Sequence, residues 1–195
     1  MNLPLNCSVD YIEDFLTQEE AQQLYYLLLD KYRIDRARII MEVGDQIIET
    51  DSFKIVFSTE ELIQKKHHIP SLDGKVFPWE GAMESLKKKV EQLVNHQFEL
   101  AMCLYYPDGN YFAPYHADQE TSGTSTILPS ISLGEVRPFC FKKNKSEEVY
   151  SLSLANGSIL IMKDYCQSRY THSLPKDPSY KKGRINITFR EADFR

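Results

Sequence analysis

The sequence predicts an α+β protein whose core is a double-stranded β-helix (jelly roll), with two N-terminal helices packed on one of its sheets. Three observations predict this fold. Two stretches of helical periodicity lie in the first half of the chain, about eight short strand-like segments follow residue 97, and turn-forming residues separate those segments. No repeat or low-complexity tract interrupts the 195 residues. We therefore expect one domain, 1–195, with a helical and lid-like extension at 1–97 and the jelly-roll core at 98–195.

The first predicted helix begins after Thr17, because Thr17-Gln18-Glu19-Glu20 has the S/T-x-x-E pattern of a capping box. The second begins near Pro78-Trp79. Each carries an apolar stripe at helical spacing, which we interpret as a core-facing surface. The stripes are Leu24, Tyr25, Leu28 and Tyr32 in the first helix, and Met83, Leu86, Val90, Leu93 and Val94 in the second.

Strand character and turn signals alternate through the second half of the chain. Pro107-Asp108-Gly109-Asn110 and Asn156-Gly157 are typical turns between such segments. The predicted strands are Phe98–Tyr106, Tyr111–His116, Thr126–Leu133, Val136–Phe141, Val149–Leu154, Ser158–Met162, Cys166–His172 and Arg184–Phe189.

The composition limits the kinds of protein that the chain can be. With 42% hydrophobic and 26% charged residues the chain resembles an ordinary soluble protein. The net charge of -5 gives no support to a nucleic-acid-coating protein, although local lysine runs could contact phosphates or simply form solvated faces. These runs are Lys65-Lys66-His67-His68, Lys87-Lys88-Lys89, Lys142-Lys143-Asn144-Lys145 and Lys181-Lys182.

The four cysteines lie far apart and form no C-x-x-C pair, which favours a reducing compartment. The N-terminus lacks the pattern of a signal peptide, and no apolar run is long enough to span a bilayer. We expect an intracellular, soluble monomer, in the cytoplasm or nucleus, with no membrane partner.

The stretch Tyr115–Glu120 places a histidine and an acid two residues apart. Side chains alternate along a strand, so His116 and Asp118 face the same side. His172 lies on a later strand that a jelly roll could bring opposite this pair. Two imidazoles and one carboxylate form the facial triad of non-haem Fe(II) oxygenases, and the absence of a cysteine ligand disfavours structural zinc. The alternative is an exposed polar turn.

The segment Arg184–Arg190 places arginines on one face of a predicted strand and apolar side chains on the other. Arginines directed into a barrel would be buried at high cost unless an anion pairs with them. A 2-oxo acid that lies between iron and an arginine would be such an anion, because guanidinium binds carboxylate in bidentate fashion. The alternative is an edge strand with exposed arginines. The alternating sets are Arg184, Asn186, Thr188 and Arg190 on one face, and Ile185, Ile187 and Phe189 on the other.

These blocks together resemble the AlkB family of Fe(II)- and 2-oxoglutarate-dependent dioxygenases over roughly the C-terminal half of the chain. The resemblance implies that His116, Asp118 and His172 bind Fe(II), and that O2 and 2-oxoglutarate are co-substrates. The motifs that carry it are Tyr106-Pro107-Asp108-Gly109, His116-Ala117-Asp118-Gln119-Glu120, Ser130-Ile131-Ser132-Leu133-Gly134, Gly157-Ser158-Ile159-Leu160-Ile161-Met162, His172-Ser173-Leu174-Pro175 and RINITFR.

The resemblance also implies roles around the co-substrate. Arg184 would pair with the distal carboxylate of 2-oxoglutarate, and Arg190, with Asn186 nearby, would support the end close to the metal. Tyr106 matches a tyrosine that contacts the co-substrate. Glu120 matches an acid that reaches the substrate base in several members. Leu104 departs from the asparagine usual at its position, which removes one polar contact to 2-oxoglutarate.

Upstream, the order Arg38, Gly44-Asp45, Phe57-Ser58 is similar to the family's nucleotide-recognition lid, although Val43 stands where the family has an aromatic residue. In this reading Phe57 is a candidate stacking surface for a flipped base. Its alternation with Phe53 and Ile55 equally predicts a core residue of a peripheral strand.

The function implied is oxidative demethylation of N-alkylated nucleobases in DNA or RNA, with alkylated nucleic acid as the substrate. Net acidity and the altered lid favour an alternative, the same chemistry on a protein side chain or a small metabolite. A non-catalytic jelly-roll binding module is the third candidate, and the intact triad with both arginines disfavours it.

Overall fold

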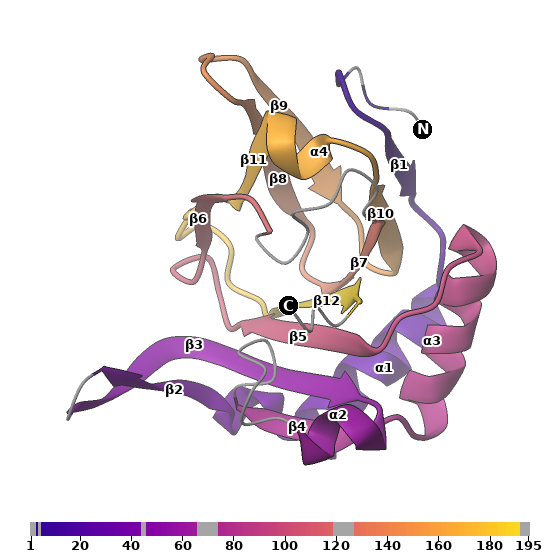
Figure 1. Ribbon diagram of the computed structural model, residues 1–195. Coiled ribbons are helices and arrows are strands. Elements are labelled where there is room, and N and C mark those ends of the chain that lie inside the picture. Colours follow the sequence, from indigo (N-terminus) through magenta and orange to yellow (C-terminus); the bar gives the residue numbers. More distant parts are fainter. Residues whose placement is uncertain (1–2, 4, 44–45, 66–73, 119–126, 192–195) are drawn as a thin grey trace.

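The structure is a computed structural model that describes residues 3, 5–43, 46–65, 74–118 and 127–191 (Figure 1). Within these residues the strands form two sheets. The larger joins strands in the order β1-β10-β7-β12-β5-β3-β2, with β4 beside β3, and the smaller has the order β6-β11-β8-β9. The strands of the larger sheet are β1 (Val9–Ile12), β2 (Arg38–Val43), β3 (Gln46–Ser58), β4 (Lys75–Pro78), β5 (Leu100–Tyr106), β7 (Leu128–Gly134), β10 (Ser158–Met162) and β12 (Arg184–Arg190). Those of the smaller sheet are β6 (Ala113–His116), β8 (Arg137–Lys143), β9 (Val149–Leu154) and β11 (Tyr170–Leu174).

Two helices, α1 (Gln18–Asp30) and α3 (Gly81–Val94), cover the outer face of the larger sheet, on the side away from the smaller sheet (Figure 1). The apolar face of β12 packs against them. Ile185, Ile187 and Phe189 are fully buried there, in one cluster with the buried residues of both helices. The opposite face of β12 is therefore directed toward the smaller sheet, which is the arrangement that the RINITFR alternation predicts.

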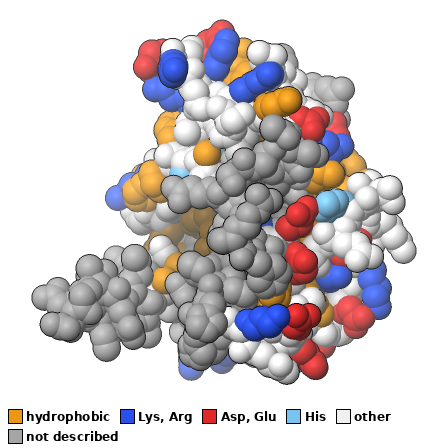
Figure 2. Space-filling view, viewed as in Figure 1, with side chains coloured by type: hydrophobic (Ala, Val, Ile, Leu, Met, Phe, Trp, Pro, Cys, Tyr) orange, Lys and Arg blue, Asp and Glu red, His pale blue; other side chains and the backbone are white. Residues whose placement is uncertain are grey.

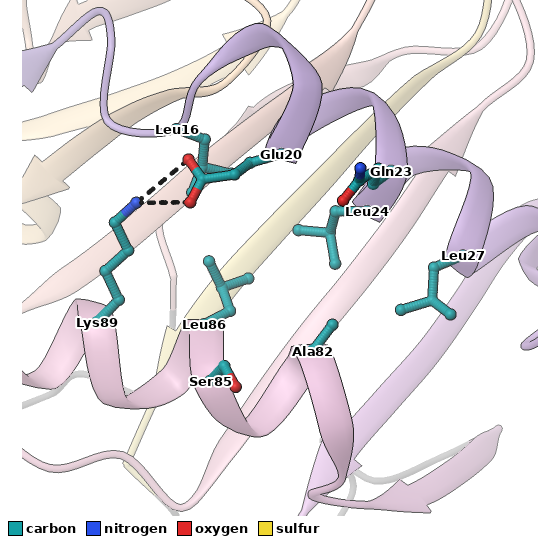
Figure 3. Close-up of a pocket in the computed structure, with 9 residues that line it drawn as sticks. All are labelled: Leu16, Glu20, Gln23, Leu24, Leu27, Ala82, Ser85, Leu86 and Lys89. Carbon is teal, nitrogen blue, oxygen red and sulfur yellow. Dashed lines mark hydrogen bonds and ion pairs between the residues drawn. The ribbon is translucent and has the colours of Figure 1, made fainter.

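Helix α1 begins as its sequence predicts. The Thr17 hydroxyl accepts a hydrogen bond from the Glu20 backbone N–H, and the Glu20 carboxylate accepts one from the Thr17 N–H. Between α1 and α3 lies a groove of about 470 Å³, lined by Leu24, Leu86 and other apolar residues (Figure 3). The ion pair between Glu20 and Lys89 crosses it. This groove lies on the helical side of the sheet, away from the inner face of β12.

The N-terminal part of the chain is not only helical and lid-like, as the sequence had suggested. It also contributes four strands to the larger sheet, and β3 pairs with β5 over six positions, from Phe53–Tyr105 to Ser58–Leu100. Short helices lie between them, η1 (Ile34–Arg36) and α2 (Glu60–Gln64). Residues on both sides of position 97 therefore build the same sheet.

The predicted strand Cys166–His172 is wrong in its first half. Residues Cys166–Arg169 form a short helix, α4, and the strand β11 begins at Tyr170. Tyr165 has a left-handed backbone conformation (φ 41°), and its carbonyl accepts hydrogen bonds from the N–H groups of Ser168 and Arg169. This turn bonds the backbone locally, so it cannot pair with a neighbouring strand until Tyr170. No helix among the described residues has the length and apolar character that crossing a membrane requires.

Candidate metal centre and co-substrate site

Three side chains of the kinds that can hold a metal ion converge where β6 pairs with β11. His116 ends β6, Asp118 follows two residues later, and His172 lies on β11, paired in register with His116. One ligand atom from each residue lies within 4.8 Å of the others. Two imidazoles and a carboxylate at these separations could hold one ion on one side and leave its other positions open.

The histidine environments suit metal binding. His116 Nδ1 lies 2.8 Å from the carbonyl oxygen of Pro114. A carbonyl can only accept, so in the neutral imidazole this contact assigns the proton to Nδ1 and the lone pair to Nε2. His172 is buried, and its ring stacks on Phe139 with centroids 5.3 Å apart. Burial lowers the pKa of His172 to about 4, although the nearby carboxylate of Asp118 acts in the opposite direction. The imidazole is therefore neutral at pH 7, the form that coordinates a metal.

Asp118 is held from two sides. One oxygen, Oδ1, accepts a hydrogen bond of 2.6 Å from Arg190, and the other, Oδ2, lies 3.6 Å from His172 Nε2. The Asp118 backbone N–H donates to the side-chain oxygen of Gln167 on α4. Burial alone would raise the pKa of Asp118, but the charge of Arg190 and its hydrogen bond to the carboxylate help to lower it below its usual value. The carboxylate is thus ionised and fixed in orientation.

The inner face of β12 extends from Arg190, which contacts Asp118, to a buried arginine at the other end of the strand. The Arg184 side chain is 2% exposed, donates to Ser132 Oγ at 2.9 Å and to Asn186 Oδ1 at 3.3 Å, and lies 5.7 Å from the centroid of the Tyr106 ring. Asn186 in turn accepts a hydrogen bond from Ser130. Burial lowers the pKa of Arg184 to about 10, so it remains charged at neutral pH.

A carboxylate fits this cluster. Within the described part of the chain the hydrogen-bond partners of Arg184 are both neutral, and its Nε has none. A buried cation with neutral partners is costly, and a carboxylate would both neutralise its charge and accept from the unused donor. The residues present therefore fit a dicarboxylic 2-oxo acid with one end at Arg184 and the other at the metal.

Leu104 lies in register between Asn186 on β12 and Lys54 on β3. The Lys54 side chain is 8% exposed and shares this inner face. A polar side chain therefore lies one strand away from the position where the AlkB family has asparagine.

The expectation that Phe57 stacks on a substrate base is wrong. Phe57 is fully buried in the cluster on the helical face of the sheet, with its ring centroid 4.8 Å from that of Tyr32 and 6.1 Å from that of Trp79. Its alternation on β3 directs it away from the metal ligands. Glu120 and Gly44-Asp45 lie outside the described residues.

On the face that Figure 2 presents, the basic and acidic side chains of the described residues are interspersed. Lys142 pairs with Glu147, and Lys143 with Glu148. Lys88 pairs with Glu84. The solvated-face interpretation holds for these three lysines.

Sequence reasoning did not identify Arg137, Ser130 or Ser132 as part of the site. A signal for each was present, because Arg137 is in phase with the inward Phe139 and Phe141, and the serines alternate with the apolar residues of β7. A polar residue that alternates in step with core-facing apolar residues points into the barrel, and there it needs a hydrogen-bond partner.

Comparison with known proteins gives consistent results. A sequence profile described as the 2OG-Fe(II) oxygenase superfamily matches residues 8–190. "Uncharacterized protein R406" of Acanthamoeba polyphaga mimivirus is 31% identical over 169 residues, covering 86% of this chain and 87% of the viral protein. Human "Alpha-ketoglutarate-dependent dioxygenase alkB homolog 3" is 29% identical over 122 residues, 57% of this chain and 43% of the human protein.

Bovine "DNA oxidative demethylase ALKBH2" is 29% identical over 123 residues, 58% of this chain and 44% of the bovine protein. The aligned region thus spans less than half the length of these two mammalian relatives. The solved structure of OsALKBH1 superposes with a TM-score of 0.65 at 12% identity, over 97% of this chain and 100% of that one. At this identity the match shows a shared fold.

Proposed function

The chain belongs to the 2OG-Fe(II) oxygenase superfamily, as an AlkB-like member, and from this premise we propose that it removes alkyl groups oxidatively from nucleobases in DNA or RNA. The observation that carries the proposal is that His116, Asp118 and His172 gather beside β12, whose Arg190 contacts Asp118 and whose Arg184 guanidinium is buried. The metal would be Fe(II), and the co-substrates 2-oxoglutarate and O2.

Bound there, Fe(II) supplies the oxidation of a substrate C–H bond by O2, coupled to conversion of 2-oxoglutarate to succinate and carbon dioxide. Arg184 binds the distal carboxylate of the co-substrate, and Tyr106 lies over that end. Arg190 fixes the orientation of the Asp118 carboxylate through its 2.6 Å hydrogen bond. An N-methyl group hydroxylated at this site leaves the base nitrogen as formaldehyde.

Exclusion of water is a further contribution of the chain. His172 is 5% exposed and Phe139 stacks on it, so the inner side of the metal site is apolar. The exposed edge of His116 leaves the opposite side open to a substrate. This asymmetry would let a substrate approach the site from the side of His116.

Nucleic acid as the substrate is supported by the relatives, since one of them is named a DNA oxidative demethylase. A protein side chain or small metabolite is the second candidate. The net charge of -5, the ion-paired lysines and the burial of Phe57 in the core favour it, because each removes a feature expected of a nucleic-acid site.

Formaldehyde release from a panel of N-methylated oligonucleotides, nucleosides and peptides tests the choice. The panel uses Fe(II), 2-oxoglutarate and ascorbate, with an unmethylated oligonucleotide as the control. We expect release from a methylated oligonucleotide in single- or double-stranded form. Release from peptides or nucleosides alone would overturn the nucleic-acid assignment and leave the oxygenase chemistry in place.

A further inference from the structure

Arg137 is a second buried arginine beside the co-substrate site. It begins β8, its residue is 1% exposed, and it shares the inner face of the smaller sheet with Phe139 and Phe141. The hydrogen bonds of its guanidinium go to backbone carbonyl oxygens. They join Nη1 to Asp108 at 3.2 Å and to Tyr111 at 2.9 Å, and Nη2 to Pro175 at 2.7 Å.

These carbonyls belong to two loops, residues 107–112 after β5 and 175–180 after β11. Gly109 donates from its N–H to Tyr180 and accepts from the Asp177 N–H, at 3.0 and 2.9 Å. The loops are so close at this point that a Cβ on Gly109 would lie 1.7 Å from the carbonyl oxygen of Asp177. Arg137 therefore joins two loops that already pack as one unit.

The ring of Tyr106 lies close to two guanidinium groups. Its centroid is 6.0 Å from the guanidinium carbon of Arg137 and 5.7 Å from that of Arg184. Tyr106 is the last residue of β5, so the first of the two loops begins directly after it. The position of that loop therefore bears on the ring that lies 5.7 Å from the Arg184 guanidinium.

Two like charges close to one partly buried ring repel each other, and both arginines bond only to neutral groups in the part of the chain that the structure describes. A ligand with a negative charge at this end would relieve the repulsion, whereas a ligand neutral at this end would not.

We propose that Arg137 is a positioning residue for the co-substrate. It fixes Tyr106 and both loops around the distal-carboxylate end, and its charge selects a 2-oxo acid that carries a second carboxylate there. The inference rests on the proposed binding of 2-oxoglutarate beside Arg184. Arg137 itself touches backbone and aromatic rings, and acts through Tyr106 and the loops.

Calorimetric titration of the Mn(II)-loaded protein tests this without turnover. The ligands are 2-oxoglutarate and 2-oxobutanoate, which lacks the distal carboxylate. In Arg137→Met we expect 2-oxoglutarate to bind about ten-fold more weakly or worse, as for other residues that orient a first-contact group. The affinity for 2-oxobutanoate should change by about two-fold or less, because that ligand has no charge at the Arg184 end.

The matched control is Lys142→Met on the same strand, which removes a charge outside the site and should bind both ligands as the wild type does. Tyr180→Leu is a milder second variant. Its ring centroid lies 5.6 Å from the Arg137 guanidinium, so 2-oxoglutarate affinity should fall about three-fold, again without a change for 2-oxobutanoate.

Wild-type 2-oxoglutarate affinity in a folded Arg137→Met, or an equal loss of both ligands, would overturn the inference and leave 2-oxoglutarate binding itself intact. If Arg137→Met does not fold, unchanged 2-oxoglutarate affinity in Tyr180→Leu has the same consequence. A wild-type protein that binds no 2-oxoglutarate would remove the proposed function and this inference together.

Discussion

Replacing Arg184 by methionine should weaken co-substrate binding strongly while leaving the unliganded protein nearly as stable as before. Methionine is similar in length and removes the charge. The prediction is informative because an ordinary buried arginine with a structural role would give the reverse result, a large loss of stability with no specific loss of a ligand.

The expected change in the stability of the unliganded protein follows from the surroundings of Arg184. Burial lowers its pKa from 12.5 to about 10, and at 1.36 kcal/mol for each pKa unit this corresponds to about 3 kcal/mol of disfavoured charge. Two hydrogen bonds, to Ser132 and Asn186, offset it by about 1.5 kcal/mol each. The free energy of unfolding without ligand should therefore change by about 1 kcal/mol or less, or roughly 2–4 °C in Tm.

With 2-oxoglutarate the two proteins should differ strongly. Removing one partner of a buried charge pair costs about 2–5 kcal/mol, so the affinity should fall about 30-fold or more. Thermal melting with Mn(II), with and without 2-oxoglutarate, measures both quantities on one sample. The control is Arg36→Met, a largely exposed arginine whose loss should leave the 2-oxoglutarate shift unchanged.

A 2-oxoglutarate-dependent rise in Tm equal to that of the wild type would refute the assignment of Arg184. A large fall in the Tm of the unliganded variant would show that the guanidinium has a stabilising partner, which contradicts the reasoning from its neutral surroundings.

Three further results are expected. Phe57→Ala should lower the free energy of unfolding by about 3–5 kcal/mol, because a fully buried core ring is lost. At a temperature where the variant is folded, its KM for the substrate should equal that of the wild type. A selective rise in KM would return Phe57 to the substrate site. Leu104→Asn should tighten 2-oxoglutarate binding about five-fold, since one hydrogen bond contributes about 1 kcal/mol; unchanged affinity would indicate that Lys54 on the neighbouring strand already makes that contact. Mn(II) should raise the Tm of the wild type but not of Asp118→Ala, and an equal rise in both would place the metal elsewhere.

The sequence predicted the inner face of the barrel well because alternation on a strand depends on the strand alone. Arg184 and Ile185 lie on opposite faces as expected, and the register of β6 with β11 brings His116 beside His172. Convergence of the triad needed only that these two strands be neighbours.

The errors have a different physical origin. Cys166–Arg169 became a helix because a left-handed residue, Tyr165, began a local turn, and β propensity did not reveal it. The alternation around Phe57 was compatible with a place in a pocket and with a place in the core. The pairing of β3 with β5 decides which face of β3 meets the helices, and the sequence pattern does not show that pairing. The alternation on β8 could have directed Arg137 inward, but its partners are backbone carbonyls of distant loops, and no side-chain motif in the sequence identifies them.

The most direct test of the account is succinate formation from 2-oxoglutarate by the wild type and by His116→Ala, Asp118→Ala and His172→Ala, with and without Fe(II). The account predicts succinate only from the wild type and only with Fe(II), while the circular dichroism spectra of all four proteins agree. Full turnover by any of the three variants, or turnover by a metal-free wild type, would contradict it.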